Sequence, residues 1–261
     1  MKVGILGAVS YEPIIEREVS RTDVKTRFGD VRVLEGTVGD ATVYYIRRFG
    51  WDNDMRSDIV NHAAHALAFR QLGVRCVITL NGFGIVNRDF GVGDLVVYDD
   101  YIRMCERFPT TVFADDKGWF RANMNVPFCP GLRRTLVEAA CAESDRTVHD
   151  GGINICVQGP YNETPAEIEL YRRWGADIVC TTIYPEVVYF RELEMCFAGL
   201  SWLSDVAGEE DERDWVMITA EELAPIMRRA IGDIGTLSGC NCQQTWAAND
   251  ESLPDWYRAI R

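Results

Sequence analysis

The sequence has no apolar run long enough to cross a membrane and too little positive charge to attract nucleic acid. No window reaches the roughly eighteen consecutive apolar residues that a membrane-spanning helix needs. Lysine and arginine number 27 against 40 aspartates and glutamates, which gives a formal net charge of −13. Such a surface repels nucleic acid and anionic membranes unless basic residues gather in a patch, and the sequence contains no such patch. We therefore expect neither kind of partner.

The sequence also lacks the even, regularly spaced cysteines of a disulfide-stapled secreted protein. Its nine cysteines are an odd number, and several lie in apolar segments such as "VRCVITL" and "INICVQG", which is typical of buried thiols in a reducing compartment. Gly4 and Gly7 interrupt the first apolar run, so it predicts a strand and not a signal peptide. We therefore expect a cytoplasmic protein.

Complete ligand patterns for a metal are missing as well. Cys240 and Cys242 form a C-x-C pair, but structural zinc needs a second pair of ligands, so we interpret them as two reduced thiols in a late loop. Asp58, His62 and His65 would share one helical face, yet metal sites close with three or four ligands and the third histidine lies in no motif that would complete this one. We predict no metal and no cofactor.

Apolar strand-like runs and helix-period segments alternate along the chain. The apolar runs are continuous, rich in Val, Ile, Leu and Cys, which predicts strands covered by helices on both faces. No Pro/Gly/Ser linker cuts the chain. We therefore predict a single-domain α/β protein over residues 1–261, with three layers (α/β/α) around a mixed, mostly parallel sheet. Helices are expected at about 58–72, 131–142, 165–174, 185–193 and 220–234.

The ends of the predicted strands carry the candidate site. In open α/β sheets, ligands bind outside the carboxyl ends of the strands. A dinucleotide-binding site at the first strand is discounted, because Gly4-x-x-Gly7 lacks the G-x-G-x-x-G spacing. The strand ends to consider are Gly7–Tyr11, Arg48–Trp51, Asn81–Gly84, Gln158–Glu163, Thr181–Glu186 and Ser204–Val206.

One long segment, Gln158–Cys196, reads "QGPYNETPAEIELYRRWGADIVCTTIYPEVVYFRELEMC". It resembles the trimeric purine nucleoside phosphorylase and methylthioadenosine phosphorylase family, with that family's G-P-x-x-E-T-x-A-E, G-A-D and T-x-x-P-E-V elements at the correct spacing. Weaker collinear matches extend the resemblance over about residues 2–242. They are "GILGAVS", "RRFG", "LNGFGI", "GVGDLVVYDDYI", "VPFCPGLR" and "SWLSD".

The resemblance implies a fold and an activity. The fold is the phosphorylase/hydrolase-like α/β fold, usually assembled as a homotrimer with active sites at subunit contacts. The activity is cleavage of the N-glycosidic bond of a purine nucleoside (5′-methylthioadenosine-like, adenosine-like or inosine-like). Phosphate is the nucleophile and co-substrate, and the products are free base and pentose 1-phosphate.

The resemblance also assigns residues to the nucleoside. Asp205 matches the catalytic position that faces purine N7, which is Asp in enzymes preferring 6-amino purines. Glu163 matches a glutamate of the 6-oxopurine enzymes, so the chain mixes both base codes. Thr181 stands where a methionine usually lies under the ribose, and a histidine supplied by a neighbouring subunit falls near Arg121. The remaining expected nucleoside contacts are Tyr161, Asn162, Phe83 and Ser204.

The phosphate pattern is altered. Phe49 stands where the family has a histidine, and the first-strand loop lacks the usual hydroxyl among glycines, although Ser10 is near. Two alternatives therefore stay open: a nucleosidase that uses water, and a repurposed nucleoside-binding protein with a rebuilt pocket. The residues expected to bind phosphate are Arg48, Thr182, the Asn81-Gly82 turn and Ser10.

Overall fold

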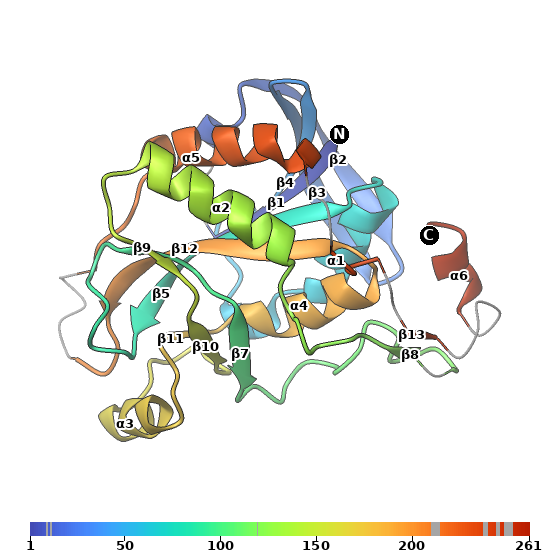
Figure 1. The fold of residues 1–261 in the computed structure, drawn as a ribbon. Coiled ribbons are helices and arrows are strands. Elements are labelled where there is room, and N and C mark those ends of the chain that lie inside the picture. Colours follow the sequence, from blue (N-terminus) through green and yellow to red (C-terminus); the bar gives the residue numbers. More distant parts are fainter. Residues whose placement is uncertain are drawn as a thin grey trace.

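The computed structural model describes residues 1–8, 10, 12–118, 120–209, 215–236, 240–243, 246–247 and 253–261. Figure 1 shows a central twisted sheet with helices on both faces, which confirms the predicted three-layer arrangement around a mixed, mostly parallel sheet. Its strands are β1 (Lys2–Gly7), β2 (Arg17–Thr26), β3 (Gly29–Val38), β4 (Ala41–Arg47), β5 (Cys76–Ile85), β6 (Leu95–Val97), β7 (Asp100–Arg103), β9 (Val148–Asp150), β10 (Ile153–Cys156), β11 (Ile178–Cys180) and β12 (Cys196–Val206).

Helices cover the sheet in pairs. Helices α2 (Pro130–Glu143) and α5 (Ala220–Asp233) pack on one face, and α1 (His62–Gln71) and α4 (Ile183–Glu192) on the other (Figure 1). Helix α3 (Pro165–Arg173) covers a smaller third core. The remaining elements are α6 (Asp255–Arg258), the 3-10 turns η1 (Glu12–Ile14), η2 (Ser57–Ile59) and η4 (Ile234–Thr236), and β8 (Phe120–Arg121) paired with β13 (Trp246–Ala247). No helix in the described ranges has the length and apolarity needed to span a membrane.

Local sequence explains where the helices begin. Thr164 and Thr219 each form a capping box with the glutamate three residues later, so α3 and α5 start where predicted. Helix α1 starts at His62 and not at Asp58, because the side chain of Asn61 accepts a hydrogen bond from the Ala64 N–H and caps the helix there. Asp58 lies in η2 instead.

The pairing of β5 opens the sheet at one place. β12 pairs with β5 along its whole length, from Cys196↔Cys76 to Val206↔Ile85. On the other edge of β5, β1 pairs only as far as Leu80, and β11 pairs antiparallel only with Gly84 and Ile85. No residue that the structure describes therefore pairs with residues 81–83 on that edge, and Gly82 is exposed although it lies within a strand. The predicted Asn81-Gly82 turn is wrong, because both residues belong to the continuous strand β5.

The β2–β3 hairpin is an element that the sequence analysis missed. β2 lies at the edge of the sheet, and its residues are exposed or half-buried throughout. It therefore has neither a continuous apolar run nor a buried alternate face that would identify a strand from sequence.

Candidate functional site

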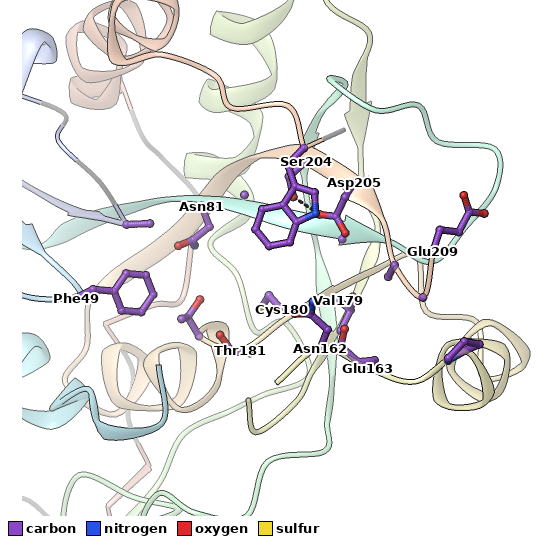
Figure 2. Close-up of a pocket in the computed structure, with 18 residues that line it drawn as sticks. Phe49, Asn81, Asn162, Glu163, Val179, Cys180, Thr181, Ser204, Asp205 and Glu209 are labelled. Atoms are coloured by element: carbon purple, nitrogen blue, oxygen red, sulfur yellow. Dashed lines mark hydrogen bonds between the residues drawn. The ribbon is translucent and has the colours of Figure 1, made fainter. Parts of the chain in front are cut away.

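A cavity of about 440 Å³ lies at the gap beside β5. Each of the strand ends singled out from the sequence supplies at least one of its lining residues, as expected for an open α/β sheet. Figure 2 shows Ser204 and Asp205 on one side of the cavity and Thr181, Asn162 and Glu163 across from them. The lining is Ala8, Phe49, Asn81, Gly82, Gly84, Asn162, Glu163, Pro165, Val179, Cys180, Thr181, Thr182, Ser204, Asp205, Ala207, Gly208, Glu209 and Trp215.

Asp205 reaches the cavity through an irregularity in β12. The pairing register with β5 shifts between Leu203 and Asp205, so Ser204 is an extra residue in the strand. A bulge of this kind changes the direction in which the following side chains point. Burial raises the pKa of Asp205 above its ordinary value, while the hydrogen bond from Ser204 works in the opposite direction.

The Ser204 hydroxyl lies between two acceptors. Its Oγ is 3.1 Å from the Phe83 carbonyl oxygen and also within hydrogen-bond distance of Asp205 Oδ1. A hydroxyl has one proton to donate and two lone pairs. When Asp205 is ionised, Ser204 can donate to the carboxylate; when Asp205 is protonated, Ser204 can accept from it and donate to Phe83. Asp205 thus keeps a partner in both protonation states.

Glu163 is the second carboxyl group with an altered pKa in this cavity. Burial raises its pKa, its own backbone N–H opposes that effect, and the charge of Asp205 adds to it. The two acids influence each other across the cavity, so they resist being ionised together. Perturbed carboxyl groups in a cleft are candidates for proton transfer or substrate recognition.

Most of the residues expected to contact a nucleoside line this cavity, but two do not. The side chain of Phe83 is buried against Tyr98, with ring centroids 5.5 Å apart, and only its carbonyl takes part, through Ser204. Tyr161 is 69% exposed and is not among the lining residues, although its neighbour Asn162 is.

The expected phosphate residues are divided. Thr182, Asn81 and Gly82 line the cavity, whereas Ser10 is exposed outside the lining. Arg48 is fully buried behind it. Its Nε and Nη2 donate to Glu186 at 2.6 and 3.0 Å, and further hydrogen bonds go to Asn81 and Thr79. A guanidinium has five N–H groups, so these four bonds leave at most one for an anion.

The two histidines on α1 belong to this buried region and not to a metal site. His62 Nδ1 lies 3.0 Å from Glu186 Oε1, and burial, with a smaller contribution from His62, lowers the pKa of His65 to about 3. Asp58 is turned away, toward Arg56 and Arg107. The three side chains do not converge.

Several lining residues were not assigned a role from the sequence. Phe49 was noted only as a replacement for histidine, yet it forms part of the wall. Glu209 and Trp215 follow β12 and also line the cavity. Trp215 comes after an acidic stretch with no apolar periodicity, so the sequence offered no pattern that would place its ring at the site.

Comparisons with known proteins identify the family. The model of the phosphorylase superfamily matches residues 2–232. The chain belongs to the phosphorylase superfamily. This confirms the family resemblance read from the strand ends.

Relatives within the superfamily are nucleoside phosphorylases by name. A protein of Methanopyrus kandleri named probable S-methyl-5′-thioinosine phosphorylase is 36% identical, over 93% of this chain and 96% of the relative. The 6-oxopurine nucleoside phosphorylase of Pyrococcus furiosus is 29% identical, covering 89% of each chain. A methylthioadenosine phosphorylase from an Antarctic soil metagenomic library shares the fold, with a TM-score of 0.89 at 20% identity, over 99% of this chain and 96% of that one.

The charged side chains that line the cavity are all acidic. Its charged lining residues are Glu163, Asp205 and Glu209, and no lysine or arginine lines it in the part of the chain that the structure describes. Because carboxylates repel an anion, an anion in this cavity would require hydroxyl and backbone donors, or protonation of the acids.

Proposed function

We propose that the protein cleaves the N-glycosidic bond of a purine nucleoside with phosphate, and that Asp205 is the general acid. The arrangement of Asp205, Ser204 and the Phe83 carbonyl carries this proposal, because it holds a half-buried carboxyl that is stable both with and without its proton. The names of the relatives support the same activity. A positioned general acid contributes about 10²–10⁴-fold to such a reaction.

The proposed reaction needs the proton at the base. A phosphate oxygen attacks C1′, the bond from C1′ to N9 breaks, and its electron pair stays with the purine. The proton of Asp205 passes to N7, so the base leaves neutral. The Ser204 hydroxyl then donates to the new Asp205 carboxylate in place of the Phe83 carbonyl, which compensates the charge formed there.

Glu163 is proposed to select the base. An ionised carboxylate accepts a hydrogen bond from the N1–H of a 6-oxopurine, whereas N1 of a 6-aminopurine carries no hydrogen and requires a donor. We therefore propose that Glu163, and not the 6-aminopurine code at Asp205, sets the preference, and that the preferred substrate is a 6-oxopurine nucleoside of the inosine or 5′-methylthioinosine kind. Two of the relatives carry names of this substrate class.

Thr182, Asn81 and Gly82, which line the cavity, are proposed to hold the phosphate. Arg48 would act mainly as a positioning residue, because its hydrogen bond to Asn81 Oδ1 fixes that side chain while Asn81 Nδ2 donates to Thr79 at 3.1 Å. Ser10 is the weakest candidate of the expected set, since it is exposed.

A homotrimer in the cytoplasm is proposed on the family resemblance. The exposed rings of Tyr161 and Trp215 lie next to or in the cavity lining, where a neighbouring subunit would cover them. Light scattering on a size-exclusion column tests this: a trimer has about three times the 29.5 kDa of one chain, and a monomeric mass would refute it.

The test of function is a product assay on inosine, 5′-methylthioinosine, adenosine and 5′-methylthioadenosine, with and without phosphate. We expect phosphate-dependent release of the base together with pentose 1-phosphate. Asp205→Asn should lose this activity, whereas Asp89→Asn, a change at an exposed surface acid outside the cavity, should keep it. Failure to release base from any substrate would refute the proposal and favour a repurposed nucleoside-binding protein.

A nucleosidase is the second candidate. The acidic lining and the engagement of Arg48 with Glu186 favour it, because water requires no anion site. The same assay distinguishes the two: base release that is independent of phosphate and yields free pentose would select the nucleosidase.

A further inference from the structure

Four cysteine thiols meet at one point outside the nucleoside cavity. The Sγ atoms of Cys129, Cys196, Cys240 and Cys242 all lie within 4.8 Å of one another, and three of the four residues are buried. The interpretation of Cys240 and Cys242 as a pair without further ligands is therefore wrong. The second pair comes from two segments that are distant in the sequence.

The spacing of the thiols fits one tetrahedral metal ion. Zinc binds thiolates at about 2.3 Å, so the sulfur atoms of a tetrahedral site are about 3.8 Å apart. Cys196 Sγ and Cys240 Sγ are 3.6 Å apart, and no pair exceeds 4.8 Å. A set of four thiolates with no oxygen ligand is typical of structural zinc.

The surroundings of the thiols suit negative charge. Cys129 is the N-cap residue of α2, a helix of 14 residues, and the positive end of a helix dipole stabilises a thiolate there. Arg191 is buried and acts electrostatically on Cys242. Four thiolates around one Zn²⁺ carry a net charge of −2, which both features offset.

We propose that Cys129, Cys196, Cys240 and Cys242 form a structural zinc site. All four positions are filled by protein ligands, so the ion has no open position for substrate and takes no part in the cleavage reaction. The proposal is independent of the proposed function, because none of these residues lines the nucleoside cavity.

The site would fix the chain that follows α5. Cys240 and Cys242 precede β13, which pairs with β8 at Arg121. The metal would join these two cysteines to Cys129 at the start of α2 and to Cys196 at the start of β12. A second attachment lies at the end of the chain, where Arg261 Nε and Nη2 donate to Glu194 at 2.9 and 3.0 Å. Zinc would thus hold the segment around Cys240 and Cys242 against α2 and β12, while other contacts, such as the ion pair of Arg261 with Glu194, hold residues 253–261.

The first experiment measures zinc by mass spectrometry in untagged protein, expressed with zinc and dialysed against a chelator. We expect about one equivalent per chain. Cys129→Ser and Cys242→Ser should lose at least nine-tenths of it. Cys141→Ser, at an exposed thiol, and Cys105→Ser, at a buried thiol outside the cluster, should retain it. Wild-type protein without zinc, or control variants that lose as much as the ligand variants, would overturn the proposal.

Cobalt and thiol titration on the wild type decide the question even if the serine variants fail to fold. Protein expressed with Co²⁺ should show the visible bands and thiolate-to-metal charge transfer of a tetrahedral thiolate site. After denaturation with a chelator, all nine cysteines should react with a thiol reagent. Four fewer reactive thiols would indicate two disulfides, and stoichiometric iron in place of zinc would indicate a different centre; either result refutes the zinc site.

The expected consequence for the tail can be read by limited proteolysis. Removal of zinc with an organomercurial and a chelator should make cleavage next to Cys240 and Cys242 at least tenfold faster, while the sheet stays resistant. Unchanged cleavage of the tail would show that the cluster does not fix it.

Discussion

Replacing Glu186 by glutamine tests the buried charge cluster behind the cavity. Burial alone would raise the pKa of Glu186, but the charge of Arg48 and the contact with His62 outweigh it and lower the pKa from 4.5 to about 2. Each pKa unit corresponds to about 1.4 kcal/mol, so the ionised Glu186 stabilises the folded state by about 3 kcal/mol at neutral pH. That agrees with the 3–5 kcal/mol expected for breaking a buried ion pair.

The sign of the pH dependence follows from the direction of the shift. Because the folded pKa lies below the unfolded one, this stabilisation is complete above about pH 4.5 and is lost as the pH falls toward 2. Glu186→Gln should therefore lower the free energy of unfolding by about 3 kcal/mol at pH 7, and the difference from wild type should shrink to about half by pH 3. Urea unfolding followed by tryptophan fluorescence measures both quantities.

The matched control is Glu18→Gln. Glu18 also makes a two-bond contact with an arginine, Arg21, at 2.9 and 3.1 Å, but both side chains are exposed. Solvent and salt screen such a pair, so its loss should leave the urea midpoint unchanged. If both variants unfolded at the same urea concentration, or if Glu186→Gln kept the wild-type difference unchanged down to pH 3, the reasoning from burial would be refuted.

Four further predictions concern the site and its surroundings. Asp205→Asn should lower kcat by at least 10²-fold. The kcat of the wild type should fall as the pH rises through the pKa of Asp205, because only the protonated acid is active. A kcat that stays constant at alkaline pH would contradict this. Ser204→Ala should lower kcat by about ten- to a hundredfold with little change in KM, the value of a hydrogen bond to a developing charge; an equal change in KM would point to binding alone. Glu163→Gln should change the ratio of kcat/KM for inosine to that for adenosine by about tenfold, and an unchanged ratio would remove Glu163 from base selection. His65→Gln should make the free energy of unfolding less sensitive to pH between 6.5 and about 3. In the wild type, His65 binds a proton in this range only in the unfolded state, because its pKa is lowered in the folded state. Identical dependence of the unfolding free energy on pH in the two proteins would contradict this.

The strand ends were predictable from the sequence because they follow continuous apolar runs. Such runs identify buried parallel strands, and the carboxyl ends of those strands meet at one edge of the sheet. Asp205 and Glu163 therefore reached the same cavity as expected. The direction of a side chain was not predictable: Arg48 lies at a strand end but turns away from the cavity toward Glu186, a pairing across 138 positions that no local pattern contains.

The thiol cluster escaped prediction for a similar reason. Cys240 and Cys242 form a recognisable local pattern. Cys129 caps α2 and Cys196 lies in the buried strand β12, and a cysteine in such a place is interpreted from sequence as an apolar core residue. The packing of α2 against β12 brings Cys129 and Cys196 together, and the segment that follows α5 adds Cys240 and Cys242. A bulge that adds Ser204 to β12 was equally invisible, because it depends on the register of pairing with β5.

The hairpin at the edge of the sheet bears on how concentrated solutions of this protein behave. No described strand pairs with the outer edge of the ten-residue strand β2, and such an edge offers N–H and C=O groups to which a strand from another molecule can add. Arg17, Glu18, Arg21, Asp23 and Lys25 lie along that edge, and a foreign strand would have to bring its own side chains against this row of alternating charge. The polar composition that prevented the prediction of β2 from sequence thus also disfavours edge-to-edge aggregation.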